Sequence, residues 1–337
     1  MNEPLFWDDG ASAKLLELIS THHYLVLCDT NTRRHCLPLL QKLCGRIDDK
    51  QIICIPAGEE NKNMETLHFV WNALFENRML RNSLLLCVGG GMVCDLGGFA
   101  AATWKRGIPF VFIPTSLMAQ ADAAIGGKTA VNFNGVKNQI GLFQRPEAVC
   151  MFHDFLHTLP VRELRSGFAE MLKHGLIANS NYWNSLCHLS KFTDILQHPE
   201  WIRKSAIIKS SFTTLDFKEQ GDRQLLNFGH TFGHALEAAE EGGLSHGEAV
   251  AHGMALAAEL SSHKQTLTAE ACHEITESIR HFYGENPIRR HAKKIIELML
   301  HDKKRVQNNF NFILLQQIGK AVGPIPVSAE EVKEMLG

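Results

Sequence analysis

Three histidines in two short segments are the residues whose spacing most clearly suggests chemistry. His230 and His234 lie four residues apart in Asn227-Phe-Gly-His-Thr-Phe-Gly-His, and His246 follows twelve residues later. A separation of four places two side chains on one face of a helix, about one turn apart. Three imidazoles suit a catalytic zinc or iron site, which keeps one coordination position open. The alternative is a set of ordinary histidines on helix surfaces.

A metal ion that polarises a substrate is expected to have a carboxylate as its third ligand, beside two histidines. The best donor is Glu170, in the segment Gly167-Phe-Ala-Glu-Met-Leu-Lys173. Glu170 and Lys173 lie three residues apart and therefore share one face of a predicted helix. The alternative interpretation of this pair is an exposed ion pair.

Several further basic residues are each typical of a solvated surface when taken alone. They are Arg106, Lys209, Arg223, Lys303 and Lys304. Gathered with Lys173 beside a metal ion, they would form a site for a small polyanion.

A run of three glycines precedes a predicted helix and follows an apolar segment. Gly89, Gly90 and Gly91 come directly after Ser83–Val88. Glycine lets the backbone approach a ligand closely, and a helix N-terminus favours an anion such as a pyrophosphate. The spacing differs from Gly-x-Gly-x-x-Gly, so a tight turn is the alternative. Asp29 ends an earlier apolar run, where its carboxylate can reach a ribose hydroxyl or serve only as a turn residue.

The polar stretch from Pro114 to Asn138 has little helical period, and we expect it to be a long functional loop. Within it, Lys128 follows two glycines and resembles a phosphate-binding lysine. The spacing of a nucleoside-triphosphatase motif is missing, so the sequence does not support that activity.

Two halves with different patterns must position these residues. In the first half, short apolar runs alternate with helical segments, which predicts a parallel sheet with helices on its faces. The predicted strands are Tyr24–Asp29, Gln51–Pro56, Ser83–Val88, Phe110–Pro114 and Ala148–Phe152, and the helices are Met64–Leu80 and Leu96–Trp104. After Pro160, helical periodicity dominates and predicts an all-helical second domain. Its helices are Val161–Ile177, Trp201–Glu219, Phe228–Glu241, Gly247–His263 and Ala269–His281.

Composition excludes several classes of protein. The 337 residues include 34 basic and 36 acidic side chains, and a net charge of −2 does not favour a nucleic-acid binder. Nine cysteines without a Cys-x-x-Cys pair favour reduced thiols over disulfides. Because no signal peptide and no membrane-length apolar run is visible, we expect a soluble cytoplasmic protein with no membrane partner.

Over nearly its whole length, the chain resembles the 3-dehydroquinate synthase family of sugar-phosphate cyclases. Eight blocks in the family's order carry the resemblance, and together they are highly specific. They are Pro56-Ala-Gly-Glu59-x-x-Lys62, Gly89-Gly-Gly-Met-Val-Cys-Asp95 through Arg106-Gly, Pro114-Thr-Ser-Leu through Asp122 to Gly-Gly-Lys128-Thr, Lys137-Asn138, Ala169-Glu170-x-x-Lys173, Arg223-x-x-Leu-Asn227-Phe-Gly-His230-Thr-Phe-Gly-His234-Ala, His246-Gly-Glu248-Ala-Val and Asp302-Lys303-Lys304.

The resemblance implies a Rossmann-like NAD-binding α/β domain over residues 1–159, a helical metal- and substrate-binding domain over 160–337, and a homodimer. The implied reaction converts 3-deoxy-D-arabino-heptulosonate 7-phosphate to 3-dehydroquinate and phosphate, in the shikimate pathway to aromatic amino acids. It passes through transient oxidation by NAD, β-elimination of phosphate, reduction, ring opening and aldol closure. Such an enzyme is a carbon–oxygen lyase.

The resemblance also implies roles for individual residues. Zinc or cobalt would be held by Glu170, His230 and His246, so His234 would face the substrate instead of the metal. NAD would be held by Asp29, Glu59, Lys62, Gly90, Gly91, Asp95, Thr115, Ser116, Lys128, Lys137, Phe155, Thr158, Leu159 and Glu163. Substrate-site positions are Asp122, Lys128, Asn138, Lys173, Lys209, Glu219, Arg223, Asn227, His234 and Lys303. Arg106 would reach the phosphate in the neighbouring subunit.

Three other functions share part of this pattern. A metal-dependent polyol or glycerol-phosphate dehydrogenase would accumulate NADH and would not need Lys128, Lys209, Arg223 and Asn227 together. Cyclases that form valiolone or inosose rings are closer alternatives, but Glu219, Arg223 and Asn227 suit a substrate carboxylate that their sugars lack. A catalytically inactive metal-binding or scaffold protein would not need every site residue. Departures from the family pattern at Cys94, Phe217-Lys218, Asp222 and Asn308 remove none of these residues.

Overall fold

The computed structural model describes residues 4–240, 243–288, 292–301 and 309–336. The chain forms two compact units, Met1–Leu164 and Arg165–Gly337. This division falls inside helix α6 (Val161–Ala178), whereas the sequence predicts a domain boundary at residues 159–160. In the parts of the chain that the structure describes, no helix is long and apolar enough to cross a lipid bilayer.

The first unit is built on a six-stranded sheet in the order β1-β8-β5-β4-β2-β3, whose strand pairs are all parallel. The strands are β1 (Leu5–Trp7), β2 (Tyr24–Asp29), β3 (Ile52–Ile55), β4 (Leu84–Gly89), β5 (Phe110–Pro114) and β8 (Ala148–Met151). The predicted parallel sheet is confirmed. Strand β1 was not predicted, because three residues are too few to carry a periodic pattern.

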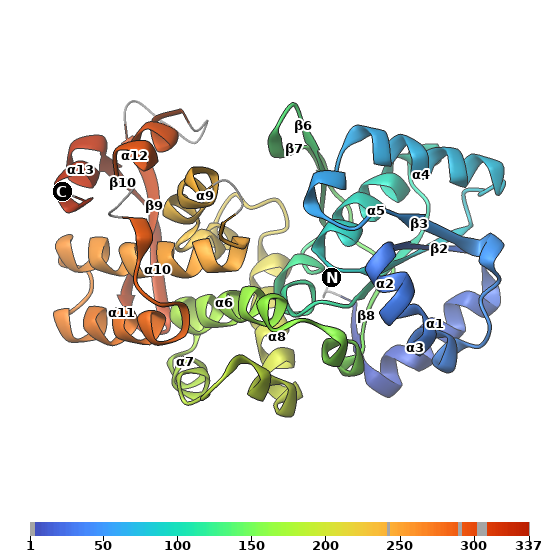
Figure 1. Ribbon diagram of the computed structural model, residues 1–337, viewed down its shortest axis with the longest axis horizontal. Helices are drawn as coiled ribbons and strands as arrows, with labels where there is room; N and C mark the ends of the chain where they lie inside the picture. Colours follow the sequence, from blue (N-terminus) through green and yellow to red (C-terminus); the bar gives the residue numbers. More distant parts are fainter. Residues whose placement is uncertain (1–3, 241–242, 289–291, 302–308, 337) are drawn as a thin grey trace. The chain divides into compact units, whose positions relative to one another are not determined.

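Helices cover both faces of this sheet (Figure 1). They are α1 (Asp8–Thr21), α2 (Thr30–His35), α3 (Leu37–Cys44), α4 (Met64–Glu76) and α5 (Gly91–Thr103). Buried residues of α1 and α3 form one core with alternate residues of the strands, including Val26, Leu86 and Ile113. On the opposite face, α5 packs against β4 and β5. This three-layer arrangement is typical of doubly wound α/β folds.

Glycines allow α5 to lie directly on the sheet. A Cβ atom added to Gly97 would lie 2.5 Å from Sγ of Cys87 and 2.8 Å from Cδ2 of Leu27. Helix α5 begins at Gly91, whereas the sequence predicts a start at Leu96. Glycine is a poor helix former, so the glycine-rich sequence at residues 89–98 does not predict the first turns of this helix. The glycines are there because the packing requires them.

The stretch from Pro114 to Asn138 is not the irregular loop that the sequence predicts. It contains a π-helical turn, Ala119–Ala123, and then a hairpin of β6 (Lys128–Phe133) and β7 (Val136–Phe143). The hairpin turns at Asn134 and Gly135, with φ of +49° and +77°. An Asn-Gly pair is a strong hairpin signal because both residues tolerate positive φ. The prediction of a loop did not take this signal into account.

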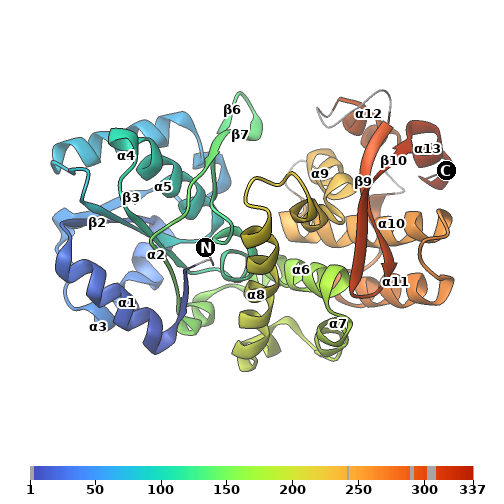
Figure 2. The ribbon, with the colours of Figure 1, turned by 180° about the vertical axis from the view of Figure 1, so that it is seen from behind.

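The second unit is mainly helical, as predicted. Its helices are α6 (Val161–Ala178), α7 (Ser180–Cys187), α8 (Pro199–Leu215), α9 (His230–Ala239), α10 (His246–His263), α11 (Ala269–Tyr283), α12 (Ala292–His301) and α13 (Ala329–Leu336). It also contains an antiparallel hairpin of β9 (Asn309–Gln317) and β10 (Lys320–Ser328). The prediction that this domain is all-helical is therefore wrong. Figure 2 shows this hairpin beside α10, where the Leu315 N–H donates to Oγ of Ser261 at 3.0 Å.

We predict that Gly97→Ala lowers the free energy of unfolding by about 1–3 kcal/mol, because the added methyl group overpacks the contact between α5 and the sheet. The midpoint of urea unfolding measures this change. Gly10→Ala in α1 is the matched control, because nothing lies within 4 Å of its added Cβ. In an exposed helix this control gains about 0.5–1 kcal/mol. Equal midpoints for the two variants would contradict the packing argument.

Candidate active site

Close backbone contacts bring the predicted metal ligands together within the second unit. Glu170 lies on α6, while α9 begins at His230 and α10 at His246. A Cβ atom on Gly247 would lie 2.0 Å from the carbonyl oxygen of Ser166, so α10 meets α6 backbone to backbone. A Cβ on Gly253 would lie 2.1 Å from the carbonyl oxygen of Gly229, where α9 begins. Two glycines of α10, Gly247 and Gly253, therefore make this approach possible.

The Glu170 carboxylate is the centre of this arrangement. Its side chain is 1% exposed, and its Oε1 lies 3.7 Å from Nε2 of His230 and 3.7 Å from Nε2 of His246. Among the described residues, none donates a hydrogen bond to this buried Oε1. A tetrahedral ion with bonds of about 2.1 Å holds its ligand atoms about 3.4 Å apart, so the three atoms fit a zinc-like ion.

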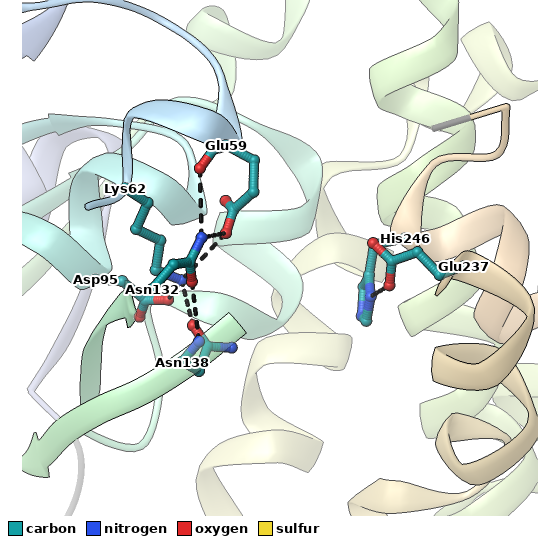
Figure 3. A network of polar contacts seen from close by, with 7 residues as sticks. All are labelled: Glu59, Lys62, Asp95, Asn132, Asn138, Glu237 and His246. Carbon is teal, nitrogen blue, oxygen red and sulfur yellow. Dashed lines mark hydrogen bonds and ion pairs between the residues drawn. The ribbon is translucent and has the colours of Figure 1, made fainter. Parts of the chain in front are cut away.

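The second nitrogen of each imidazole is engaged by an oxygen. Nδ1 of His246 lies 3.1 Å from Oε2 of Glu237 (Figure 3), and Nδ1 of His230 lies 3.2 Å from the carbonyl oxygen of Phe228. A proton on each Nδ1 satisfies these contacts and leaves the Nε2 lone pair for a metal. Glu237 was not predicted to take part in the site, although it lies one turn beyond His234 in the same helix.

The pKa values of the two histidines move in opposite directions. Burial, with the nearby Lys173 charge, lowers the pKa of His230 well below its usual range, so the ring is neutral. Burial also disfavours the charged form of His246, but the hydrogen bond to Glu237 and the charge of Glu170 outweigh it and raise the pKa. Protons therefore compete more strongly with a metal ion for His246 than for His230.

His234 lies one turn along α9 from His230. Its ring centroid is 5.3 Å from that of His230 and 5.7 Å from that of His246, and its side chain is exposed. One imidazole nitrogen from each of the three histidines lies within 4.8 Å of the other two. Glu170 therefore lies beside two histidines, with the third at the edge of the cluster.

Three basic side chains predicted for the substrate site are buried in this unit. Lys173 is 2% exposed, Lys209 is 8% exposed and Arg223 is 1% exposed. Lys173 forms an ion pair with Oε2 of Glu170. Because both partners are buried, the alternative of an exposed ion pair is wrong, and Lys209 and Arg223 are not ordinary surface cations.

One loop gathers Glu219, Arg223 and Asn227. Nδ2 of Asn227 donates to Oε1 of Glu219 at 2.9 Å, and Nη1 of Arg223 donates to the carbonyl oxygen of Phe217 at 2.5 Å. The Asp216 carboxylate accepts from the backbone N–H groups of residues 220, 221 and 223 at 2.9, 2.7 and 3.2 Å. These bonds lower the pKa of Asp216. Asp216 thus organises the loop, and no pattern in the sequence had predicted this role.

The nucleotide site predicted for the first unit would lie at the carboxyl ends of its strands. From β2 the chain adds β3 on one side and then crosses to β4 on the other, so the strand order reverses between β2 and β4. Ligands of open α/β sheets bind at such a point. Asp29 ends β2, and Gly90 is the N-cap of α5, close to Ser116 beyond β5. Oδ1 of Asp29 also accepts from Thr32 N–H at 2.7 Å, so this residue caps α2 as well.

A buried lysine links three segments beside this end of the sheet (Figure 3). Nζ of Lys62 lies 2.5 Å from Oδ2 of Asp95 and 2.5 Å from Oδ1 of Asn138, with Oε1 of Glu59 at 3.7 Å. Nδ2 of Asn132 donates to Oε1 of Glu59 at 3.0 Å. Residues predicted for NAD and for substrate therefore meet in one network.

Most of the remaining predicted residues lie at varied positions in the first unit. Phe155 is buried in the core, and its carbonyl oxygen accepts from Oγ1 of Thr158 at 2.7 Å. Asp122 lies in the π-helical turn, and Gly91 and Thr115 flank the ends of β4 and β5. Arg106, Lys128, Lys137 and Glu163 are exposed, and Leu159 is half-buried. Lys303, with Lys304 and Asn308, lies outside the described residues.

We predict that Glu237→Ala weakens zinc binding by about 10–100-fold, because the hydrogen bond that orients His246 and raises its basicity is lost. Competition with a chelator of known affinity measures the change. Glu270→Ala, at the exposed start of α11, is the matched control and should leave the affinity unchanged. A change of less than about threefold for Glu237→Ala would show that this carboxylate does not support the site.

Known proteins share the sequence and the fold of this chain. The family model for the N-terminal part of 3-dehydroquinate synthase matches residues 52–166, and the model for the C-terminal part matches residues 167–305. The 3-dehydroquinate synthase of Parabacteroides distasonis is 38% identical over 332 residues, which cover 96% of this chain and 94% of that protein. The enzyme of Nitrosomonas europaea is 42% identical over 295 residues, which cover 84% and 79% of the two chains.

A solved structure agrees with these matches. The 2-epi-5-epi-valiolone synthase of Streptomyces hygroscopicus, with NAD+ and Zn2+ bound, has a TM-score of 0.86 at 25% identity, with coverage of 100% of this chain and 96% of that one. The two family models together match well over half of the sequence. The chain belongs to the 3-dehydroquinate synthase family.

Proposed function

We propose that this chain converts 3-deoxy-D-arabino-heptulosonate 7-phosphate to 3-dehydroquinate and phosphate, which makes it a carbon–oxygen lyase. The observation that carries the proposal is the buried Glu170 carboxylate, whose Oε1 lies 3.7 Å from Nε2 of both His230 and His246. Buried basic residues of the same unit supply the charge that an anionic sugar phosphate requires. The particular substrate and product are inferred from membership of the 3-dehydroquinate synthase family.

The proposal includes two cofactors. Glu170, His230 and His246 would hold zinc or cobalt, while the glycine-rich start of α5, with Asp29 and Lys62, would hold NAD. When bound, NAD accepts a hydride and later returns it, and the metal ion lowers the pKa of the substrate hydroxyl that is oxidised. The substrate then loses phosphate by β-elimination, is reduced, opens its ring and closes again by an intramolecular aldol reaction.

The chain's own residues bind the substrate and move its protons. His234 is exposed beside the metal ligands, which suits it to take the proton from the oxidised hydroxyl. Lys173, Lys209 and Arg223 would bind the substrate's anionic groups. Within the loop that Asp216 organises, Glu219 accepts a hydrogen bond from the Asn227 amide, which would fix the Asn227 side chain for hydrogen bonds to substrate hydroxyl groups.

The remaining residues and the assembly are part of the same proposal. Asp122, Lys128, Asn138 and Lys303 would complete the substrate site, and Arg106 would reach the phosphate bound to a second copy in a cytoplasmic homodimer. The NAD site would also include Glu59, Gly90, Gly91, Asp95, Thr115, Ser116, Lys128, Lys137, Phe155, Thr158, Leu159 and Glu163.

One assay tests the reaction. With the heptulosonate phosphate, NAD and zinc supplied, we expect release of phosphate and formation of dehydroquinate without net NADH, because the hydride returns to the product. Accumulation of NADH would instead indicate a polyol dehydrogenase. Absence of phosphate release under every metal condition would reject the proposal.

Substitution of His234 tests its role as a proton carrier. We expect His234→Ala to lower the turnover number by about 100-fold or more, the usual contribution of a positioned acid–base group. Its zinc content should match that of the unaltered chain, because His234 is not assigned as a ligand. A turnover number within about twofold of the unaltered chain would show that the role is wrong.

The ligand assignment has a separate test in metal content. We expect Glu170→Ala, His230→Ala and His246→Ala each to lower bound zinc well below stoichiometric, as measured by elemental analysis after gel filtration. His234→Ala is the matched control, since it removes an imidazole from the same cluster. Stoichiometric zinc in any of the three ligand variants would overturn the assignment for that residue.

A further inference from the structure

An irregularity in the β6–β7 hairpin places Asn138 in an unusual conformation. Val131 pairs with Ile140, but Phe133 pairs with Val136, so Asn132 alone lies opposite residues 137–139. Asn138 lies within this bulge and has a φ of +53°. Bulges near active sites commonly redirect a side chain, and asparagine tolerates the left-handed region better than most residues.

The side chain of Asn132 replaces the ladder bonds that the bulge removes. Its Oδ1 accepts from the Asn138 N–H at 2.9 Å, and its Nδ2 donates to Oε1 of Glu59 at 3.0 Å. The Asn132 N–H donates to the carbonyl oxygen of Lys62 at 2.8 Å. One residue therefore ties the bulge to the segment that carries Glu59 and Lys62 (Figure 3).

The orientation of the Asn138 amide follows from its partner. The Lys62 ammonium can only donate, so the amide oxygen must face it, at 2.5 Å. The Lys62 side chain is 4% exposed and is also paired with Asp95, so this contact is firmly placed. The NH2 group of Asn138 is then the part available to a ligand, and it recognises an acceptor oxygen.

We propose that Asn132 is a positioning residue that holds Asn138 in the left-handed conformation, so that Asn138 donates to an oxygen of the substrate. This inference rests on the proposed function, because it assigns Asn138 to the same substrate site. Asn132 also contacts the segment with Glu59 and Lys62, which is proposed to bind NAD. Its side chain would therefore connect that segment to substrate recognition.

Hydrogen exchange in the free full-length chain tests the hold itself, without any activity. In Asn132→Ala we expect amides of residues 136–143 to exchange about tenfold faster, the effect of losing one hydrogen bond. Asn132→Asp, made together with Glu59→Gln, keeps an acceptor for the Asn138 N–H and a donor–acceptor pair between residues 132 and 59, so its exchange should lie nearer to that of the unaltered chain. Asn77→Ala, which loses the bond from its Nδ2 to the carbonyl oxygen of Ala73, is the control and should leave this segment unchanged.

The exchange result can contradict the inference in two ways. If exchange in Asn132→Ala stays within about twofold of the unaltered chain, Asn132 does not hold the Asn138 backbone in place. Equal exchange in the Ala and Asp variants would show that the acceptor is not what matters. Either result stands whether or not the chain has the proposed activity.

A double-mutant cycle on substrate KM tests the link to function. We expect Asn132→Ala to raise KM about tenfold with a smaller change in kcat, because a donor to bound substrate is misplaced. We expect Asn132→Ala to add little in an Asn138→Ala background, since Asn132 acts through Asn138. Multiplicative effects of the two substitutions would overturn the link, whereas an inactive unaltered chain would reject the proposed function instead.

Discussion

The close backbone approach of α6, α9 and α10 is the constraint on which the second unit depends. Gly247 lies against the Ser166 carbonyl, and Gly253 lies against the Gly229 carbonyl, at distances that no side chain permits. Helices that approach this closely leave little freedom to the residues beside the contact. Glu170, His230 and His246 therefore converge on one point, and a rigid scaffold determines the geometry of their ligand atoms.

Convergence has an electrostatic consequence. A buried carboxylate is costly unless charge or hydrogen bonds compensate it, and Glu170 has Lys173 on one oxygen and two imidazoles near the other. Glu237 extends the arrangement outward by fixing the ring of His246. The centre thus combines a negative charge, two imidazole nitrogens and hydrogen-bond partners that fix the rings, which is a pattern typical of metal sites in enzymes.

The first unit also has a buried charge whose burial is compensated, and this charge is positive. Lys62 is a buried cation, and carboxylates and an amide from three separate segments surround it. Because the start of α5, the segment after β3 and the β6–β7 hairpin all contribute partners, the lysine joins them at one edge of the sheet. A near-neutral chain can in this way hold strongly charged sites, since its net charge of −2 averages over local clusters.

Much of the fold followed from local pattern. The parallel strands and the helix faces could be predicted because periodicity is a property of neighbouring residues. The set of Glu170, His230 and His246 followed only from the resemblance to a family, because no local pattern joins segments so far apart in the sequence. The hairpin β6–β7 had a local signal in Asn134-Gly135, and β9 had buried Phe310, Phe312 and Leu314 at alternate positions. Each of these signals covers only a few residues. The first lies in a polar stretch and the second in a half of the chain dominated by helical periodicity, so neither hairpin was predicted.

The order of the amino acids specifies which chemical groups this protein has and on which face of each helix they lie. Packing in three dimensions makes Lys173 and Glu170 a buried pair and brings Glu237 to His246. It also decided that Asn132 holds Asn138 at a bulge. These contacts join residues by packing and not by periodicity, and whether a charged group is buried depends on neighbours that a linear pattern does not identify.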